Sequence, residues 1–298
     1  MRFLIAGSSG FLGTQLRERL HAEGHAVTRL VRRPPGEGEV QWDPYDAPLR
    51  PEVVDQHDVV VNLAGSPLTG NPHSKRWADE LLRSRVTTTR VLAEAIASSE
   101  RKPAFLAGNG SSWYGDRGDT PLCESEPSTG EAFMTMVTRE WQAATAAAQA
   151  AGARVCVLRS APVIDRRNLP WKAMFPAFRL GIGGMAGSGE QYLPAISARD
   201  WIGAAVHVAL DESVSGPVNL SCPEAPRHRE FVKGLGHLLH RPTVVRVPSA
   251  VVRVAAGRMA PEVLGSTRPV PEVLLSSGYS FRDPDVTAIL QQGLSPTQ

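Results

Sequence analysis

Three glycines near the start of the chain constrain its fold more than any other feature. An apolar strand, Phe3 to Ala6, is followed by Gly7-Ser-Ser-Gly10-Phe-Leu-Gly13 and then by a helix. In such a strand–turn–helix unit the first glycine permits a tight turn, the second lets backbone approach a pyrophosphate, and the third lets the helix pack on the sheet. The alternative is a glycine-rich turn in an ordinary βα unit. The context favours a dinucleotide site with these cofactor-binding residues: Gly7, Ser9, Gly10, Phe11, Leu12 and Gly13.

The end of the second strand indicates which dinucleotide is bound. Residues 26–31 form an apolar strand that ends on Arg32 and Arg33, and the first acidic residue beyond it is Glu37. A site for NAD usually has an acidic residue here to bind the ribose 2′-hydroxyl, whereas a guanidinium group suits a 2′-phosphate. We therefore predict NADP(H), with Arg32 favoured over Arg33 because Pro34 restricts the turn. The alternative is that both arginines are solvated.

Strands and helices continue to alternate along the first half of the chain. Apolar strands are predicted at 58–65, 103–107 and 154–159, with helices at about 73–98 and 131–151 and a glycine-rich loop at 182–191. This order predicts an α/β fold with a Rossmann-type, doubly wound parallel sheet, whose ligands bind at the carboxyl ends of the strands. The strand end Leu63, Ala64 and Gly65 is therefore added to the cofactor site. We expect an NADP-binding domain at 1–160 and a smaller substrate-binding lobe at 161–298, interleaved with the last sheet strands.

Composition narrows the class of protein. The chain has 298 residues, of which 42% are hydrophobic and 21% charged, as is typical of globular proteins. A formal charge of +2 gives no reason to expect nucleic acid or an anionic membrane as a partner. The three cysteines, Cys123, Cys156 and Cys222, lack metal-ligand spacing and indicate a reducing compartment. We expect a cytoplasmic protein, a monomer or homodimer, with a small-molecule substrate, no metal, no signal peptide and no membrane span.

Further short motifs are distributed along almost the whole chain: Trp42-Asp-Pro44, Val61-Asn-Leu-Ala-Gly65, Lys75-Arg-Trp77, Trp113-Tyr-Gly-Asp116, Gly187-Ser-Gly-Glu-Gln191 and Gly278-Tyr-Ser-Phe281. With these motifs the chain resembles an extended short-chain dehydrogenase/reductase, and more closely the nucleoside-diphosphate-sugar epimerase family with a characteristic C-terminal domain. The resemblance implies a Rossmann fold, NADP(H) and an oxidoreductase or epimerase activity. It also implies Pro162 and Val163 as the wall beside the nicotinamide, and Glu80 facing the cofactor unless it is a solvated helix residue.

The usual catalytic residues of the short-chain dehydrogenases are missing. Those enzymes use a Tyr as general acid/base, a Lys four residues later that lowers the pKa of the Tyr, and a Ser that orients the substrate. The resemblance places Phe133 at the Tyr position, Val137 at the Lys position and Asn109 at the Ser position. Ser111 is nearby, and Tyr114 is the remaining tyrosine near the predicted crevice. Our catalytic candidates are therefore Tyr114 as proton donor, Asn109 and Ser111; the alternative for Tyr114 is packing in the substrate wall.

The predicted substrate lobe also departs from its relatives. Residues 195–200 read Ala-Ile-Ser-Ala-Arg-Asp where relatives read Trp-Ile-His-Ile-Asp-Asp, so that Arg199 replaces an acidic residue. Such an arginine either binds a carboxylate or phosphate or is a solvated charge at a helix start. Aromatic residues on nearby loops either line a pocket or pack internally. The predicted substrate residues are Ser112, Trp171, Tyr192 and Arg199.

Three functions follow from this pattern. The first is an NADP(H)-dependent oxidoreductase or epimerase that acts on a small molecule without the usual Tyr-x-x-x-Lys. The second is a catalytically silent NADP(H)-binding regulatory protein, since some relatives are linked to cell division. The third is a non-redox cyclase or isomerase on the same fold. The intact glycine turn supports cofactor binding, whereas Phe133 and Val137 weigh against ordinary dehydrogenase catalysis.

Overall fold

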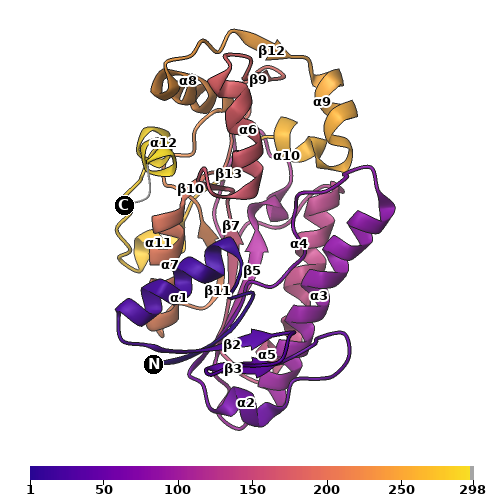
Figure 1. The fold of residues 1–298 in the computed structure, drawn as a ribbon, viewed down its shortest axis with the longest axis vertical. Coiled ribbons are helices and arrows are strands. Elements are labelled where there is room, and N and C mark those ends of the chain that lie inside the picture. Colours follow the sequence, from indigo (N-terminus) through magenta and orange to yellow (C-terminus); the bar gives the residue numbers. More distant parts are fainter. Residues whose placement is uncertain (296–298) are drawn as a thin grey trace.

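The computed structural model describes residues 1–295, except for the side chains of residues 169, 170 and 173. Its centre is a seven-stranded sheet in the order β11-β7-β5-β4-β1-β2-β3, with every neighbouring pair parallel (Figure 1). This confirms the predicted Rossmann-type, doubly wound fold. The strands are β1 (Arg2–Ala6), β2 (Ala26–Val31), β3 (Glu39–Gln41), β4 (Val59–Asn62), β5 (Ala104–Gly110), β7 (Val155–Ser160) and β11 (Gly216–Leu220).

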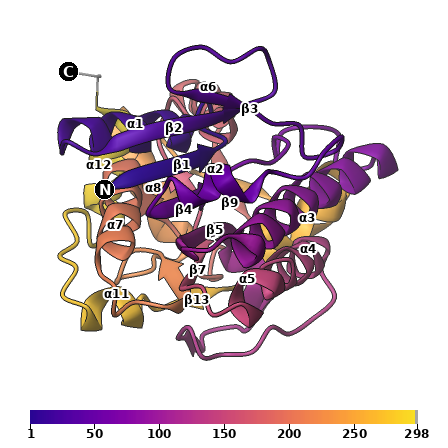
Figure 2. The same cartoon turned by 90° about the horizontal axis from the view of Figure 1, so that it is seen from below.

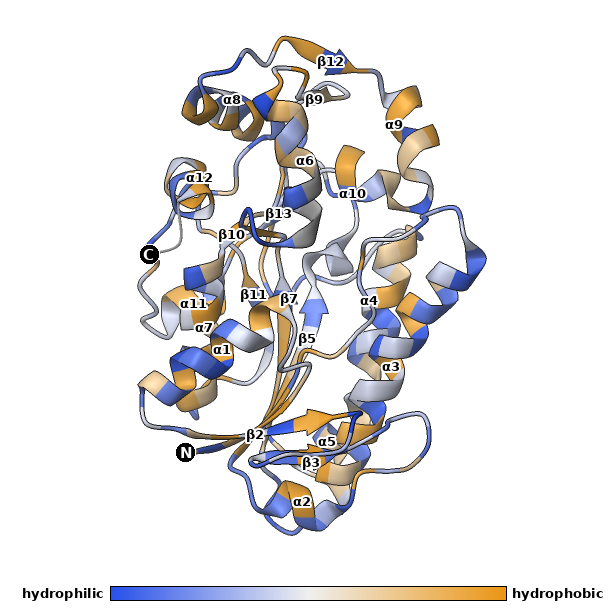
Figure 3. Ribbon diagram, viewed as in Figure 1, coloured by the Kyte–Doolittle hydropathy of each residue, from blue (hydrophilic) through white to orange (hydrophobic). Residues whose placement is uncertain are grey.

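Helices cover both faces of the sheet, as Figure 2 shows. One face packs against α1 (Phe11–Ala22) and α7 (Ala198–Leu210), and the other against α2 (Pro51–Asp55), α3 (Lys75–Ser98) and α5 (Ala146–Ala150). Alternate residues of β1 serve the two cores: Phe3 and Ile5 point to the first, Leu4 and Ala6 to the second. Because the central strands are buried on both faces, they are apolar almost throughout, and much of their ribbon is orange in Figure 3.

Two predicted segments differ from the structure. The predicted helix at 131–151 is broken into α4 (Phe133–Ala143) and α5, because the hydroxyl of Thr145 donates back to the carbonyl oxygen of Gln142 at 2.8 Å. The predicted loop at 182–191 contains strand β9 (Gly184–Ala186), which pairs with β12 (Val245–Val247). The partner strand lies about sixty residues later in the chain, so local sequence gave no sign of it.

The C-terminal part builds a third core beyond the sheet. Helices α6 (Leu169–Arg179), α8 (His228–Leu239) and α12 (Val286–Leu294) surround Phe231, Leu235, Ile289 and Leu290. Its strand β11 is part of the main sheet, so this part is interleaved with the sheet. Its remaining elements, with two short ones from the first half, are η1 (Ser111–Tyr114), β6 (Pro121–Leu122), β8 (Val163–Ile164), β10 (Ile196–Ser197), α9 (Ser249–Ala256), η2 (Gly257–Met259), α10 (Ala260–Leu264), β13 (Arg268–Pro269) and α11 (Glu272–Ser276).

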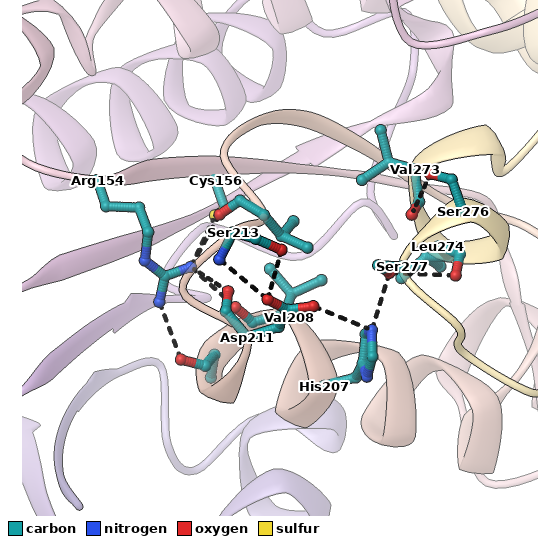
Figure 4. Close-up of polar contacts among 12 residues, drawn as sticks. Arg154, Cys156, His207, Val208, Asp211, Ser213, Val273, Leu274, Ser276 and Ser277 are labelled. Atoms are coloured by element: carbon teal, nitrogen blue, oxygen red, sulfur yellow. Dashed lines mark hydrogen bonds and ion pairs between the residues drawn. The ribbon is translucent and has the colours of Figure 1, made fainter.

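One arginine ties the end of α7 to the sheet (Figure 4). The guanidinium of Arg154, just before β7, donates to the carbonyl oxygens of Val208 (3.0 Å) and Ala209 (2.9 Å). These carbonyls belong to the last turn of α7, where a helix has no partners of its own. Nε2 of His207 lies 2.8 Å from the hydroxyl of Ser277, which connects the same helix to α11. These contacts fix the C-terminal part to the seven-stranded sheet.

Candidate functional site

A cavity of about 710 Å³ lies at the carboxyl ends of β1, β2 and β4. This is the edge where a doubly wound sheet binds its ligands. The cavity brings together the glycine turn, the end of the second strand and the end of β4, as the sequence indicated. The predicted cofactor residues that line it are Gly7, Ser9, Gly10, Arg32, Arg33, Leu63, Ala64, Gly65 and Glu80.

Two of the three glycines are required by the protein itself. Gly7 has φ +80°, and a Cβ there would lie 2.5 Å from the backbone carbon of Leu63. A Cβ on Gly13 would lie 2.2 Å from the carbonyl oxygen of Gly7, so Gly13 permits the close approach of α1. Gly10 is different, because a Cβ there would meet only the Gly7 oxygen, at 3.3 Å. The turn therefore leaves space beside Gly10, on the side that faces the cavity.

The start of α1 supplies donors at this turn. Gly10 is the N-cap residue and makes no side-chain cap, so the first N–H groups of the helix have no side-chain partner. Phe11, Leu12 and Gly13 form this first turn and do not themselves line the cavity. An open helix N-terminus with space beside it suits a phosphate group. The residues present therefore fit the pyrophosphate of a dinucleotide.

The two arginines at the end of β2 differ in their contacts. Arg33 donates from Nη1 to Oε2 of Glu39 (2.7 Å) and from Nη2 to Oε1 (2.6 Å). Arg29 approaches the same carboxylate at 2.5 Å. The hydrogen bond from Arg33, aided by the backbone of Gly36, lowers the pKa of Glu39. Arg32 forms no ion pair within residues 1–295, so it is the cation on the cavity wall that can bind an added anion.

Buried polar side chains hold the end of β4 in place. Asn62 donates from Nδ2 to the hydroxyls of Thr88 (3.2 Å) and Thr89 (2.9 Å) and accepts from the backbone N–H of Ala64 (3.0 Å). Arg85 donates from Nη1 to the carbonyl oxygen of Ser66 at 3.1 Å, and burial lowers its pKa to about 10. The cavity wall from Leu63 to Ser66 is therefore preorganised by α3, and does not depend on a ligand for its shape.

One wall of the cavity is aromatic and was not predicted from the sequence. Trp42 and Tyr45 line it beside Pro44, and the guanidinium of Arg83 lies 4.6 Å from the centre of the Tyr45 ring. The exposed carboxylate of Glu80 is on the same cavity. The motif Trp42-Asp-Pro44 was the available signal, although nothing in it gives the direction of its side chains. Further cavity residues that were not predicted are Ser8, Arg29, Leu30, Val31, Ser66, Pro67, Ser84 and Thr88.

The structure does not bring Tyr114 or Asn109 to this cavity. Tyr114 is fully buried; its hydroxyl donates to Oδ1 of Asn219 (2.7 Å) and accepts from Arg159 (3.0 Å), and burial raises its pKa. Asn109 donates to the carbonyl oxygen of Thr138 (3.1 Å) and accepts from the backbone of Gly110 (2.7 Å). The predicted proton donor, Tyr114 in η1, and the predicted substrate-orienting amide, Asn109 in β5, are thus both engaged in internal hydrogen bonds.

Residues 133 and 137, where the resemblance implied the Tyr and Lys positions, are apolar and lie in apolar surroundings in the structure. Val137 is buried in a cluster with Leu81 and Met134, and the Phe133 ring packs against it, 5.8 Å from the ring of Trp77. Ser111, the third catalytic candidate, is buried at the start of η1. Neither Phe133 nor Val137 can transfer a proton, so α4 contributes no acid or base at these two positions.

The four predicted substrate residues have separate surroundings. Ser112 donates to Oε2 of Glu262 at 2.5 Å. Nε of Arg199 donates to Oδ2 of Asp283 at 2.6 Å, so this arginine is occupied by an internal ion pair. Trp171 packs in the third core, 5.2 Å from the ring of Phe231. The guanidinium groups of Arg227 and Arg268 lie 4.5 Å and 5.0 Å from the centre of the Tyr192 ring.

The structure also bears on the predicted nicotinamide wall, on metal binding and on membrane-spanning helices. Pro162 is exposed and Val163 is buried in β8, and neither lines the cavity. Among the described side chains, no group of three His, Cys, Asp or Glu residues is arranged to hold a metal ion. No helix within residues 1–295 is both long and apolar enough to span a membrane.

Comparisons with known proteins agree with this architecture. The NAD dependent epimerase/dehydratase family matches residues 3–220, and a domain of unknown function, DUF1731, matches residues 247–292. The human epimerase family protein SDR39U1 is 35% identical over 298 residues, covering 98% of this chain and 99% of that protein. The epimerase family protein MT2273 of Mycobacterium tuberculosis is 34% identical over 279 residues, covering 93% and 92%.

Solved structures show the same fold. The crystal structure of human SDR39U1 (isoform 2) with NADPH has a TM-score of 0.87 and 31% identity, covering 98% of this chain and 99% of that one. The UDP-glucuronic acid 4-epimerase of Bacillus cereus, in complex with UDP-glucuronic acid and NAD, has a TM-score of 0.76 at 14% identity, and covers 98% of each chain. Sheet, glycine turn and sequence matches together show that the chain belongs to the NAD dependent epimerase/dehydratase family, with a C-terminal DUF1731 domain.

Proposed function

We propose that this protein binds NADPH in the 710 Å³ cavity and acts on a small molecule as an oxidoreductase or epimerase of the short-chain dehydrogenase type. The observation that carries the proposal is the pairing of two features on one cavity. Gly10 leaves space at the N-terminus of α1, and Arg32 is a cation without an ion-pair partner in the described part of the chain. The human relative crystallised with NADPH supports the choice of cofactor.

In this proposal, different residues of the chain bind different parts of the cofactor. The turn from Gly7 to Gly10 and the open N–H groups of α1 bind the pyrophosphate. The guanidinium of Arg32 binds the 2′-phosphate, and the wall of Trp42 and Tyr45 covers the adenosine end. Residues 63–65, fixed by Asn62, form the opposite wall. The nicotinamide ring, when bound, supplies or accepts a hydride. Residues 161–298 serve in this proposal as the substrate-binding lobe.

The cofactor assignment is tested by replacing the two arginines separately. Arg32→Ala should weaken NADPH binding by about 10- to 100-fold, the size of one lost charge-assisted contact, and change NADH binding little. Arg33→Ala is the matched control, because Glu39 already holds that guanidinium. Fluorescence titration with NADPH and NADH gives all four affinities. Equal losses for both cofactors in Arg32→Ala would contradict the 2′-phosphate assignment.

Turnover separates the proposal from a second candidate. Because Phe133 and Val137 lie in an apolar cluster and Tyr114 is sealed from the cavity, an NADPH-binding protein without catalysis is the specific competitor. The experiment follows the loss of NADPH absorbance with 9,10-phenanthrenequinone, aldehydes and ketones, and assays UDP-glucose for epimerisation. Reduction or epimerisation of any probe supports the enzyme. Tight NADPH binding with no reaction of any probe supports the non-catalytic function.

A further inference from the structure

A carboxyl group from the C-terminal domain lies next to the end of β5. Glu262, in the first turn of α10, accepts a hydrogen bond from the hydroxyl of Ser112 in η1, with Oγ 2.5 Å from Oε2. The two residues are 150 positions apart in the chain. Oε1 of Glu262 has no hydrogen-bond partner within the described chain, and the side chain is partly exposed. This carboxyl therefore keeps one oxygen available to a ligand.

The same segment covers the position where the Tyr–Lys pair is missing. Met259, three residues before Glu262, packs with Phe133 against the cluster of Leu81, Met134 and Val137. Helix α4 contacts both η1 and η2, and η2 leads directly into α10. Glu262 is thus held between the carboxyl end of β5 and the first turn of α4. The neighbouring strand in the sheet is β4, whose end forms the cavity wall.

The surroundings of Glu262 favour a carboxyl that can hold a proton. Burial raises its pKa, and the hydrogen bond from Ser112 opposes part of that rise. The charged or titratable side chains on the adjoining elements are Arg253 on α9, Arg258 on η2, Asp116 after η1, Arg139 and Glu140 on α4, and His73, whose ring lies beside Gly257. Arg258 donates to the backbone carbonyls of residues 72 and 73, and none of the basic side chains among these forms an ion pair with Glu262 in residues 1–295.

We propose that Glu262, positioned by Ser112, is the proton donor that replaces the missing tyrosine. This inference rests on the proposed NADPH-dependent function. In reduction of a carbonyl compound, a hydride drawn from the nicotinamide cofactor adds to the carbonyl carbon, and the π electron pair moves to the oxygen. The O–H bond of the Glu262 carboxylic acid breaks, and its proton bonds to that oxygen. The carboxylate then takes a proton from solvent, so atoms and electrons balance.

The placement is tested without any substrate. Protein labelled with ¹³C at the glutamate carboxyl carbons is titrated by NMR, and Glu262→Gln assigns the resonance. With NADP⁺ bound, the Glu262 carboxyl should titrate about one pH unit lower than with NADPH, because the cationic ring favours the carboxylate. Adenosine 2′,5′-bisphosphate, which lacks the nicotinamide, should leave the titration as in the free protein. Equal midpoints with NADP⁺ and NADPH would overturn the placement.

The positioning role of Ser112 has its own readout. Because the Ser112 hydroxyl lowers the carboxyl pKa, Ser112→Ala should move the Glu262 titration to higher pH. The same shift should appear in the alkaline limb of the turnover profile. A midpoint that is unchanged in Ser112→Ala would show that the hydrogen bond does not tune the carboxyl, and would remove Ser112 from the proposal.

Turnover tests the proton transfer itself. Glu262→Gln should lower kcat for 9,10-phenanthrenequinone by about 100- to 10,000-fold with unchanged NADPH affinity. Glu272→Gln, also in the first turn of a short C-terminal helix, is the matched control and should keep full turnover. Full turnover by Glu262→Gln beside an active wild type would overturn this inference alone. A wild type that binds no NADPH, or neither reduces nor epimerises any probe, would overturn the proposed function and the inference with it. A wild type that epimerises UDP-glucose but reduces no probe would overturn this inference alone.

Discussion

The hydroxyl of Tyr114 donates a 2.7 Å hydrogen bond to Oδ1 of Asn219, across 105 residues of the chain. The same hydroxyl accepts a hydrogen bond from Arg159, whose guanidinium lies 4.2 Å from the centre of the Trp113 ring. Arg159 also donates to the side chain of Gln142. Burial lowers the pKa of Arg159 and raises that of Tyr114. This polar cluster connects η1, β7 and β11 inside the protein.

Tyr114→Phe therefore tests a structural role. Removal of the hydroxyl leaves Oδ1 of Asn219 and one N–H of Arg159 without a buried partner. We expect the free energy of unfolding to fall by about 1–3 kcal/mol, with NADPH affinity and turnover unchanged. Urea denaturation measures the first quantity and fluorescence titration the second. Lost turnover at full stability would instead return Tyr114 to the catalytic role that the sequence first indicated.

Alanine should have different effects at two glycines of the turn: at Gly10 it should weaken NADPH binding, and at Gly13 it should destabilise the fold. Gly10→Ala meets only the Gly7 oxygen at 3.3 Å, so the fold should tolerate it while the methyl group occupies the space offered to the pyrophosphate. NADPH affinity should fall with little change in thermal stability. Gly13→Ala would put its Cβ 2.2 Å from the Gly7 oxygen and should cost about 1–3 kcal/mol of stability. Thermal unfolding measures the stability of both variants, and titration with NADPH measures their cofactor affinity. A Gly10→Ala protein with normal affinity would place the phosphates elsewhere.

The ion pair of Arg199 and Asp283 calls for a double-mutant cycle. The Asp283 side chain is fully buried, whereas that of Arg199 is 47% exposed, so solvent screens part of the interaction. Arg199→Ala leaves a buried carboxylate without its cation and should cost about 1–3 kcal/mol. Adding Asp283→Asn should recover part of this lost stability. The coupling energy, by which the effect of the double mutant differs from the sum of the two single effects, should exceed about 0.5 kcal/mol. Urea denaturation of the four proteins gives the coupling. Additive effects, with a raised KM for Arg199→Ala, would support the earlier substrate assignment.

One buried and one partly buried histidine, His57 and His228, give a pH dependence of stability. Burial lowers the pKa of His57 and of His228 below the ordinary histidine value of 6.5, and the Nδ1 atom of His228 is buried without a hydrogen-bond partner among the described residues. Below about pH 6.5 the histidines of the unfolded chain bind protons that those of the native state do not. The free energy of unfolding therefore falls as the pH drops through the pKa values that the two histidines have in the folded protein. Urea denaturation at pH 7.5 and 5.5 should show this fall. His228→Gln should reduce it; an unchanged fall would show that His228 does not contribute.

Some of the candidate site could be predicted because its causes are local. The turn from Gly7 to Gly13 is fixed by backbone sterics within seven residues, and nine of the fourteen predicted cofactor residues line one cavity. Asn62 and the apolar strand before it could be recognised for the same reason. Pro34 already favoured Arg32 over Arg33, but the ion pair that holds Arg33 could not be predicted, because it depends on how Glu39 lies beside β2.

The sequence by itself determined the parallel sheet, the glycine turn and the absence of any Tyr-x-x-x-Lys motif, since each follows from residue type and short-range periodicity. Only the tertiary structure decided where the remaining polar side chains act. Tyr114 meets Asn219, Arg199 meets Asp283 and Ser112 meets Glu262 across 84 to 150 residues, and β9 becomes a strand only by pairing with β12. A buried polar group must find a partner, and which partner it finds is fixed by the path of the chain and not by its neighbours in sequence.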